Sequence, residues 1–321
     1  GVKPAVKLAV AHAAPVFMDT EATVEKACSW IERAGREGVH LLAFPEVFVP
    51  GFPYWINCYP PLVQGGLNRR YRDAAITADG PELARIRGAA REAGVAVALG
   101  FCEREAGTLY NAIAFVECDG TLLGVHRKIQ PTYAERYIWG RGDASTLSVF
   151  ESSVGRVGGL ACWEHTMNLA RQALVEQGIE IHVGAWPSLS TMAGFESVAD
   201  RQIEAMMRNH ALTGQCFVLC ASSPVGPDVL PFLEAELGPQ EFLKPGGGWS
   251  AIIHPFTPDL AGPHAGAEEE LLSAEIDLGE LGDVKMWLDG AGHYARPELL
   301  WMVMDDRPKR GLVRSSEEEP D

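Results

Sequence analysis

The sequence has few of the features that mark nucleic-acid-binding or membrane proteins. Its 27 lysines and arginines are outnumbered by 43 aspartates and glutamates, which gives a net charge of −16, and no basic run occurs. Nucleic-acid binding depends on clustered positive charge, so we expect no such partner. No apolar run is long enough to cross a bilayer, so we expect no membrane association either.

Cysteine and histidine are not spaced as metal ligands or as a disulfide framework. The 7 cysteines are scattered and odd in number, without a Cys-x-x-Cys pair, and the 9 histidines form no His-Glu-x-x-His pattern. We therefore predict no metal site, and a reducing cytoplasm is the compartment that fits best. Cys216 and Cys220 flank an apolar run and are expected to lie in the core.

Strand-like and helix-like segments alternate through the 321 residues, which is the pattern of an α/β layered fold with a mixed sheet. We expect one domain over residues 1–310, followed by an acidic, flexible tail over 311–321. Residues 224–248 are rich in proline and glycine and are expected to form a long surface loop. The predicted strands are 7–14, 39–44, 95–102, 108–117, 121–128, 149–160, 179–185, 216–221, 249–254 and 271–276, and the predicted helices are 81–93, 169–176, 197–213 and one from a cap at 19–21 to residue 36.

A cysteine at an abrupt strand end is the most informative feature that is present. The apolar run of residues 155–160 leads to Cys162, and a helical pattern follows from residue 167. We expect Cys162 on a strand-to-helix elbow, where the side chain is rigid and nearby backbone N–H groups can stabilise an oxyanion. The alternative is a small buried apolar residue, which is what most free cysteines are.

Two charged residues follow apolar strands in a similar way. Glu46 comes after the run 39–44, and Lys128 ends the run 121–128. Burial would raise the pKa of Glu46 toward the range of a general base. Because functional groups of α/β folds gather at strand ends, a base, a cation and a nucleophile can meet there. Taken singly, Glu46 fits a salt-bridged or capping carboxylate and Lys128 fits an ordinary surface cation.

Several motifs extend beyond these residues and occur in one order. The first motif is Phe44-Pro45-Glu46, which continues at 50–55. The second spans 126–132 and continues at 135–140, and the third spans 159–164. Shorter matches occur at 109–111, 248–250 and 292–298. Together they resemble the nitrilase superfamily of carbon-nitrogen hydrolases, whose members carry a Glu-Lys-Cys triad. The resemblance extends from about residue 7 to about residue 300.

The sequence around the cysteine is similar to one branch of that superfamily. Cys-Trp-Glu at 162–164, with the segments 135–140 and 292–297, resembles the true nitrilases, and its extension through His165 and Thr166 is similar to bacterial arylacetonitrilases. Two positions depart from that pattern. Asn168 stands where proline is common, and Asn57 stands where an aromatic residue is common near the pocket entrance. These departures leave the substrate preference open.

The resemblance implies a four-layer α-β-β-α sandwich, with homodimers that join through helices near the active site and extend into larger oligomers or spirals. It implies hydrolysis of a small-molecule nitrile, aryl or arylalkyl, to the carboxylic acid and ammonia without a cofactor. Cys162 would be the nucleophile and Glu46 the proton carrier. Lys128 and the backbone N–H of Trp163 would stabilise negative charge, and Glu135 would hold the Lys128 ammonium.

Aromatic residues near strand ends are candidates for the walls of a substrate pocket. Trp186 follows the predicted strand 179–185 and is the favoured one, because it falls at the expected sheet edge. Core packing is an equal alternative for Trp55 and Phe195. The candidate substrate-binding residues are Tyr54, Trp55, Thr132, His165 and Trp186, with Phe195 as a further pocket wall and Asn111 as a hydrogen-bonding support.

Three alternative functions remain open. An aliphatic amidase or a cyanide-hydrolysing enzyme of the same superfamily would share the fold and the covalent chemistry. A non-catalytic binding or filament-forming protein on the same scaffold would have no need of all three triad residues, and all three are present. The residues therefore favour an enzyme.

Overall fold

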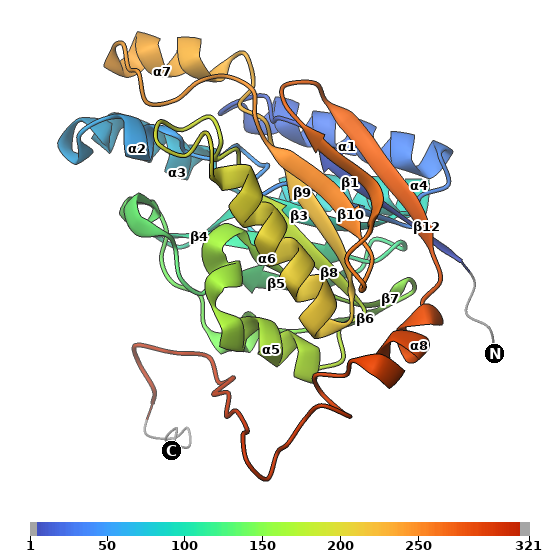
Figure 1. Cartoon of the computed structure of the whole chain (residues 1–321). Helices are drawn as coiled ribbons and strands as arrows, with labels where there is room; N and C mark the ends of the chain where they lie inside the picture. Colours follow the sequence, from blue (N-terminus) through green and yellow to red (C-terminus); the bar gives the residue numbers. More distant parts are fainter. Residues whose placement is uncertain (1–4, 315–321) are drawn as a thin grey trace.

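Two six-stranded mixed sheets form the centre of the molecule, in a computed structural model that describes residues 5–314 (Figure 1). The first sheet contains, in spatial order, β12 (Glu270–Ile276), β1 (Val6–His12), β2 (Leu41–Ala43), β3 (Ala96–Glu105), β4 (Thr108–Val116) and β5 (Leu122–Arg127). The second contains β11 (Asp259–Ala265), β10 (Trp249–Ile253), β9 (Phe217–Ser222), β8 (Ile181–Trp186), β7 (Gly155–Ala161) and β6 (Phe150–Ser152). β1–β3 and β7–β9 run parallel, and the remaining neighbours are antiparallel.

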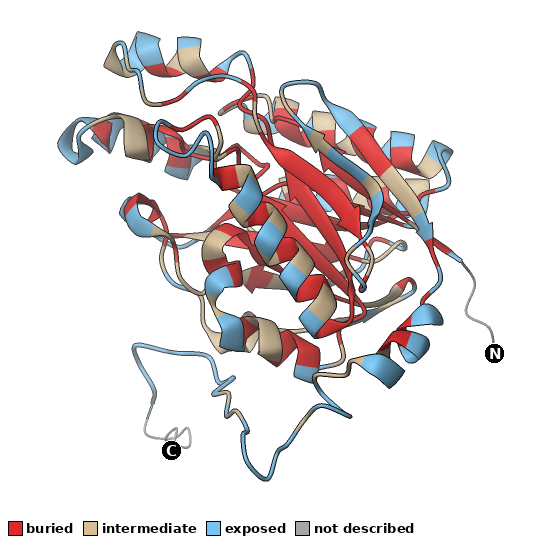
Figure 2. Ribbon diagram, in the orientation of Figure 1, coloured by how far each residue is buried: buried red, intermediate tan, exposed pale blue. Residues whose placement is uncertain are grey.

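Helices cover the outer face of each sheet, so the molecule has the four-layer α-β-β-α arrangement that the sequence resemblance implies (Figure 1). α1 (Thr20–Arg36) and α4 (Pro81–Ala93) pack on the first sheet. α5 (Asn168–Glu176) and α6 (Ala199–Gly214) pack on the second. Figure 2 shows β8, β9 and β10 buried, whereas β11 and β12, at sheet edges, include exposed residues. α6 alternates between buried and exposed residues along its length.

The central core lies between the two sheets and explains the apolar runs in the sequence. In β1, Leu8 and Val10 belong to this central core, while Ala9 and Ala11 belong to the core beneath α1 and α4. Both faces of the strand are therefore buried, and its sequence is continuously apolar rather than alternating. The predicted buried strands at 7–14 and 39–44 are confirmed, the second as the shorter β2.

The structure differs from the sequence prediction in the segment 224–248. This segment contains α7 (Val229–Leu237), whose Val229 and Leu233 are buried against neighbouring aromatic residues. Pro231 lies in the first turn of α7, where a backbone N–H has no helical partner, so proline is compatible with the helix. The sequence also did not indicate α2 (Trp55–Cys58), α3 (Gly65–Ala74), α8 (Glu280–Trp287) or β11.

Membrane-spanning helices, the cysteines and the C-terminal tail can each be compared with the sequence predictions. Within residues 5–314, no helix is both long enough and apolar enough to cross a membrane. All seven cysteines are unpaired, and Cys216 and Cys220 are buried, as predicted. Of the tail predicted at 311–321, residues 315–321 lie outside the described residues.

Three strand ends bring functional side chains together from both sheets. β2 ends at Ala43, shortly before Glu46, and β5 ends directly before Lys128. Both strands belong to the first sheet, whereas β7, which ends directly before Cys162, belongs to the second. The candidate site is therefore assembled from two sheets.

Candidate active site

Cys162 begins a short 3-10 helix, Cys162–Thr166, directly after β7. Its backbone φ is 53°, in the left-handed region that residues with a side chain seldom adopt. The surrounding structure must hold this turn, because the residue itself does not favour it. The side chain is buried, and the backbone N–H of the next residue, Trp163, acts to lower the pKa of its thiol. The predicted elbow at Cys162 is confirmed, with the 3-10 turn preceding α5.

Lys128 lies at the centre of a buried network of charged groups. Its Nζ donates to Glu46 Oε1 at 2.8 Å and to Glu135 Oε1 at 2.7 Å. Asn111 Nδ2 also donates to Glu46 Oε1, at 2.7 Å. Glu46 Oε2 has no hydrogen-bond partner among the described residues. The structure thus brings the predicted Glu46, Lys128 and Glu135 together, and Asn111 holds Glu46 as a support.

The pKa values of this network suit proton transfer by Glu46 rather than by Lys128. Burial raises the pKa of Glu46 to about 7, although the Lys128 ammonium opposes the rise. A carboxyl group with such a pKa can take up and release a proton near neutral pH. Burial alone would lower the pKa of Lys128, but the charges of Glu135 and Glu46 raise it well above its usual value. Lys128 therefore remains a cation.

The Cys162 thiol needs a base to become reactive. Burial raises its pKa well above the usual value, and the negative charge of Glu46 adds to the effect. The Lys128 ammonium and the Trp163 N–H act in the opposite direction. The thiol therefore keeps its proton at neutral pH until a neighbouring group removes it, and Glu46 is the carboxylate with the strongest influence on it.

Glu164 connects the strand end that carries Cys162 to the strand end that carries Lys128. Its Oε1 accepts from the backbone N–H of Ala161 at 3.0 Å, and its Oε2 accepts from that of Ile129 at 2.6 Å. The ring of His126 is 3.0 Å from Oε1 and completes the contacts of this buried carboxylate. The motif around Cys162 contains Glu164, but no sequence pattern indicated that it joins the two loops.

An apolar cavity of about 410 Å³ opens above the cysteine. Cys162 and Glu135 lie in its wall, so both are accessible to a small molecule, and Thr132 lines it as predicted. Asn57, at one of the two positions that depart from the arylacetonitrilase pattern, also lines it. The remaining lining residues are mostly aromatic or aliphatic: Phe52, Tyr133, Trp163, Leu189, Met192, Phe195 and Phe242. Core packing and pocket lining were equal alternatives for Phe195, and the structure places it at the cavity.

Comparison with known proteins identifies the family to which this arrangement belongs. Residues 7–286 match the profile of a family described as Carbon-nitrogen hydrolase. The chain belongs to the carbon-nitrogen hydrolase family. A carbon-nitrogen hydrolase from Helicobacter pylori has the same fold, with a TM-score of 0.71 at 20% sequence identity, over 92% of this chain and 97% of that one.

Relatives within the carbon-nitrogen hydrolases are considerably more similar in sequence. A nitrilase of Pseudomonas syringae is 37% identical over 97% of this chain and 93% of its own length. An aliphatic nitrilase of Rhodococcus rhodochrous is 38% identical, over 94% of this chain and 83% of its own length. An arylacetonitrilase of Aspergillus niger is 37% identical, over 95% of this chain and 93% of its own length.

Four residues predicted to bind substrate do not line the cavity. Trp186 is fully buried, and its ring stacks on His165 with 5.4 Å between the ring centroids. Both nitrogens of His165 are used by other protein groups. Trp55 is fully buried and donates to Asn68, and the Tyr54 hydroxyl accepts from the Ser188 N–H. Trp55, His165 and Trp186 follow strands or turns that lead to the site, but they turn into the core behind it. Burial raises the pKa of Tyr54, and the charges of Glu46 and Cys162 add to the rise, so its hydroxyl group lies near these two residues.

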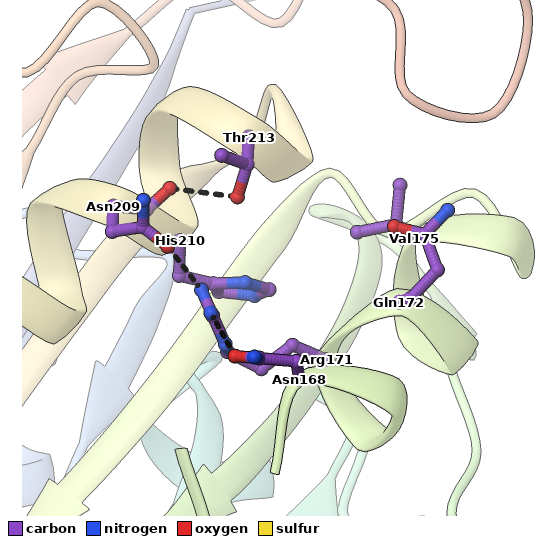
Figure 3. A pocket seen from close by; sticks show the side chains of 7 residues that line it. All are labelled: Asn168, Arg171, Gln172, Val175, Asn209, His210 and Thr213. Atoms are coloured by element: carbon purple, nitrogen blue, oxygen red, sulfur yellow. Dashed lines mark hydrogen bonds between the residues drawn. The ribbon is translucent and has the colours of Figure 1, made fainter. Parts of the chain in front are cut away.

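A second hollow, of about 320 Å³, lies between α5 and α6 (Figure 3). Arg171 extends across it and donates to the side-chain oxygens of Asn209 and Asn168, both at 2.8 Å. The ring of His210 lies beside the Arg171 side chain (Figure 3). No group of three or more His, Cys, Asp or Glu residues within 5–314 is arranged to hold a metal ion, here or elsewhere.

Proposed function

We propose that this carbon-nitrogen hydrolase is a nitrilase, which converts an organic nitrile and two water molecules into a carboxylic acid and ammonia. The observation that carries the proposal is the thiol of Cys162 in the wall of an apolar cavity, under the influence of the buried Glu46 and Lys128. The names of its relatives, which include a nitrilase, an aliphatic nitrilase and an arylacetonitrilase, support this reaction.

In the first half of the reaction, Cys162 Sγ forms a bond with the nitrile carbon. Glu46, through its free Oε2, takes the thiol proton and passes it to the nitrile nitrogen, so a neutral thioimidate results. Lys128 and the backbone N–H of Trp163 stabilise the negative charge that develops during the attack. Donors of this kind typically contribute about 100- to 1,000-fold each to the rate.

In the second half, water adds to the thioimidate carbon and gives up a proton through Glu46 to the nitrogen. The resulting tetrahedral species expels ammonia and leaves a thioester on Cys162. A second water molecule then attacks the thioester, and the carboxylic acid departs as the thiol is restored. Glu135 keeps the Lys128 ammonium in place throughout, and no cofactor is needed, because protein groups supply the nucleophile and every proton transfer.

We propose an aryl or arylalkyl nitrile as the preferred substrate. The cavity above Cys162 has phenylalanine side chains at three positions, 52, 195 and 242, together with Leu189 and Met192. Such a lining favours a ring over a charged or strongly polar group. A volume of about 410 Å³ accommodates a benzyl group with room for the attacking water.

A substrate panel tests the reaction and the preference together. Purified protein is incubated with phenylacetonitrile, benzonitrile, valeronitrile, phenylacetamide and cyanide, and ammonia, acid and amide are measured. We expect ammonia and acid from the aromatic nitriles, with the highest kcat/KM among the five compounds. Ammonia from phenylacetamide alone would assign the protein to the amidases, and ammonia from cyanide alone to the cyanide-hydrolysing enzymes.

We also propose that the chain forms homo-oligomers in a reducing cytoplasm. Apolar side chains such as Met286, Trp287 and Trp301 are more than two-thirds exposed, at 71%, 75% and 74%, and a second copy of the chain would cover them. Seven unpaired cysteines suit the reducing compartment. Light scattering after gel filtration should give a mass of at least two chains, and a monomer at all concentrations would contradict this part of the proposal.

A further inference from the structure

Three fully buried histidines form a chain behind the candidate nucleophile. His165 follows Cys162 by three residues, His182 lies on β8, and His210 lies on α6. The rings of His165 and His182 are joined by a hydrogen bond of 2.8 Å between their Nε2 atoms. The ring centroids of His182 and His210 are 4.1 Å apart, and His210 also lines the hollow of Figure 3. The mechanism above uses none of these side chains.

The contacts of His165 define which of its nitrogens carries a proton. His165 Nδ1 lies 2.7 Å from the backbone carbonyl oxygen of Cys162, which can only accept a hydrogen bond, so Nδ1 must donate. Burial lowers the pKa of His165 to about 4, so the ring is neutral and its Nε2 has no proton. His165 Nε2 therefore accepts, and the proton in the contact between the two rings belongs to His182.

Burial and the neighbouring side chains keep the three imidazole rings neutral and His165 in its orientation. Burial lowers the pKa of His182 and of His210 well below the usual value, and the charge of Arg171 adds to both effects. The three rings thus stay neutral, with a positive guanidinium at the end remote from Cys162. Trp186 stacks on His165 with 13° between the ring planes, which restricts rotation of the imidazole.

We propose that His165 is a positioning residue for Cys162: it holds the carbonyl group of the cysteine, while His182 fixes its tautomer and Trp186 its orientation. The need for such a hold follows from the cysteine backbone, whose φ of 53° is unfavourable for any residue with a side chain. With the carbonyl group fixed, the peptide that follows is fixed too. The Trp163 N–H, which acts to lower the pKa of the Cys162 thiol, is then held beside the sulfur.

This inference rests on Cys162 being the nucleophile, and two pairs of variants test it. Asparagine can present an N–H where the histidine has Nδ1, so His165→Asn keeps the donor and His165→Leu removes it. Glutamine can present an N–H where the histidine has Nε2. His182→Gln therefore keeps the hydrogen bond that fixes the tautomer of His165, and His182→Leu removes it. We expect kcat to fall about tenfold to a hundredfold in both leucine variants, with KM changed less than threefold and most of kcat retained in the amide variants.

Two further measurements separate positioning from a general loss of structure. The rate at which iodoacetamide alkylates Cys162 should fall with kcat in the leucine variants, because the thiol itself is displaced. The matched control is His12→Leu, which alters another fully buried histidine, bound to Ser250 and the Gly266 carbonyl group, in the first sheet. It should lower the melting temperature as much as His165→Leu does, without the loss of kcat that the His165 and His182 leucine variants show.

A spectroscopic signature completes the test. Nitrogen NMR of protein labelled with ¹⁵N-histidine should show His165 as the neutral Nδ1–H tautomer and His182 as the neutral Nε2–H tautomer at pH 7. Equal kcat in the leucine and amide variants, or an Nε2–H tautomer at His165, would overturn the inference. Failure of the wild-type protein to release ammonia from any nitrile or amide would instead overturn the proposed function.

Discussion

The two carboxylate oxygens of Glu46 have different environments. Oε1 accepts from Lys128 and Asn111, which fixes the orientation of the group, whereas Oε2 has no partner among the described residues. One oxygen thus anchors the carboxylate and the other remains available for a proton. This division explains how a residue paired with a cation can still act as a base.

A first prediction concerns the covalent step. Cys162→Ala should reduce turnover of phenylacetonitrile below detection and leave the melting temperature within a few degrees, because alanine fits the buried site without a clash. With a slowly hydrolysed nitrile, intact-mass analysis of the wild type should show an acyl or thioimidate adduct that the variant lacks. Cys118→Ala is the control, since this half-buried thiol contacts Ser153 and lies away from the cavity, and it should stay active. Measurable turnover in Cys162→Ala would exclude this nucleophile.

The pH dependence of kcat/KM gives a second prediction. Because the pKa of Glu46 is raised to about 7 and the carboxylate form is the base, activity should rise with pH through a midpoint near 7. The pKa values of Cys162 and Lys128 are raised well above their usual values, so we expect a plateau from about pH 8 to 9 rather than a fall. A midpoint near the usual value for glutamate would contradict the raised pKa of Glu46.

At the scale of the secondary-structure elements, the strand ends were more predictable from sequence than the pocket walls. Glu46, Lys128 and Cys162 could be found because each charged or reactive side chain interrupts an apolar run. Trp186 also follows such a run, yet it turns into the core and stacks on His165. Sequence periodicity gives the end of a strand but not the direction that the next side chain takes, and that direction decides which residues reach the cavity.

Elements without an apolar period were missed for a similar reason. α7 contributes two buried side chains, Val229 and Leu233, within a segment rich in proline and glycine. β11 is an edge strand whose residues are mostly exposed, so its sequence has no alternation to detect. The long strands that are buried on both faces, in contrast, were found because such burial requires a continuous run of apolar residues in the sequence.

A third prediction concerns the connection that Glu164 makes between β5 and β7. Glu164→Gln replaces an oxygen that accepts a backbone N–H by an amide that donates, so either Ala161 or Ile129 loses its acceptor. We expect the free energy of unfolding to fall by about 1–3 kcal/mol, together with a fall in kcat, because the two loops carry Cys162 and Lys128. Urea denaturation and steady-state kinetics measure the two effects.

The matched control for this substitution is Glu269→Gln. Glu269 also accepts a backbone N–H, from Ala14, but it lies on a partly exposed surface away from the cavity. It should change kcat by less than twofold. If Glu164→Gln lowers stability without changing kcat, the connection supports the fold and not the geometry of the site.

For the whole molecule, the buried histidines make stability depend on pH. His165, His182 and His210 have lowered pKa values in the folded protein, chiefly because of burial, so below pH 6.5 the unfolded chain binds more protons than the folded one. These three residues therefore lower the stability as the pH drops below 6.5, whereas His126, whose pKa Glu164 raises against the effect of burial, acts in the opposite direction. Each imidazole that stays neutral contributes a loss on the order of 2 kcal/mol at pH 5.

A fourth prediction follows from this proton balance. Neither ring nitrogen of His210 has a hydrogen-bond partner within residues 5–314, so His210→Phe removes a buried polar group without breaking a bond. Between pH 7 and pH 5, the melting temperature of the variant should fall less than that of the wild type, as measured by calorimetry. His293→Phe, at an exposed position, should leave that difference unchanged. An unaltered pH dependence in His210→Phe would mean that the ring is protonated in the folded protein.

The division of the site between two sheets has a consequence for the order in which the chain becomes active. Glu46 and Lys128 lie in the first half of the chain, on the sheet that β12 completes only at residue 276, whereas Cys162 lies on the other sheet. During synthesis, the base and the cation are made before the nucleophile, and neither half of the chain contains all three. Recovery of activity in a refolding experiment would thus report the docking of the two sheets, later than the appearance of helix or strand signals.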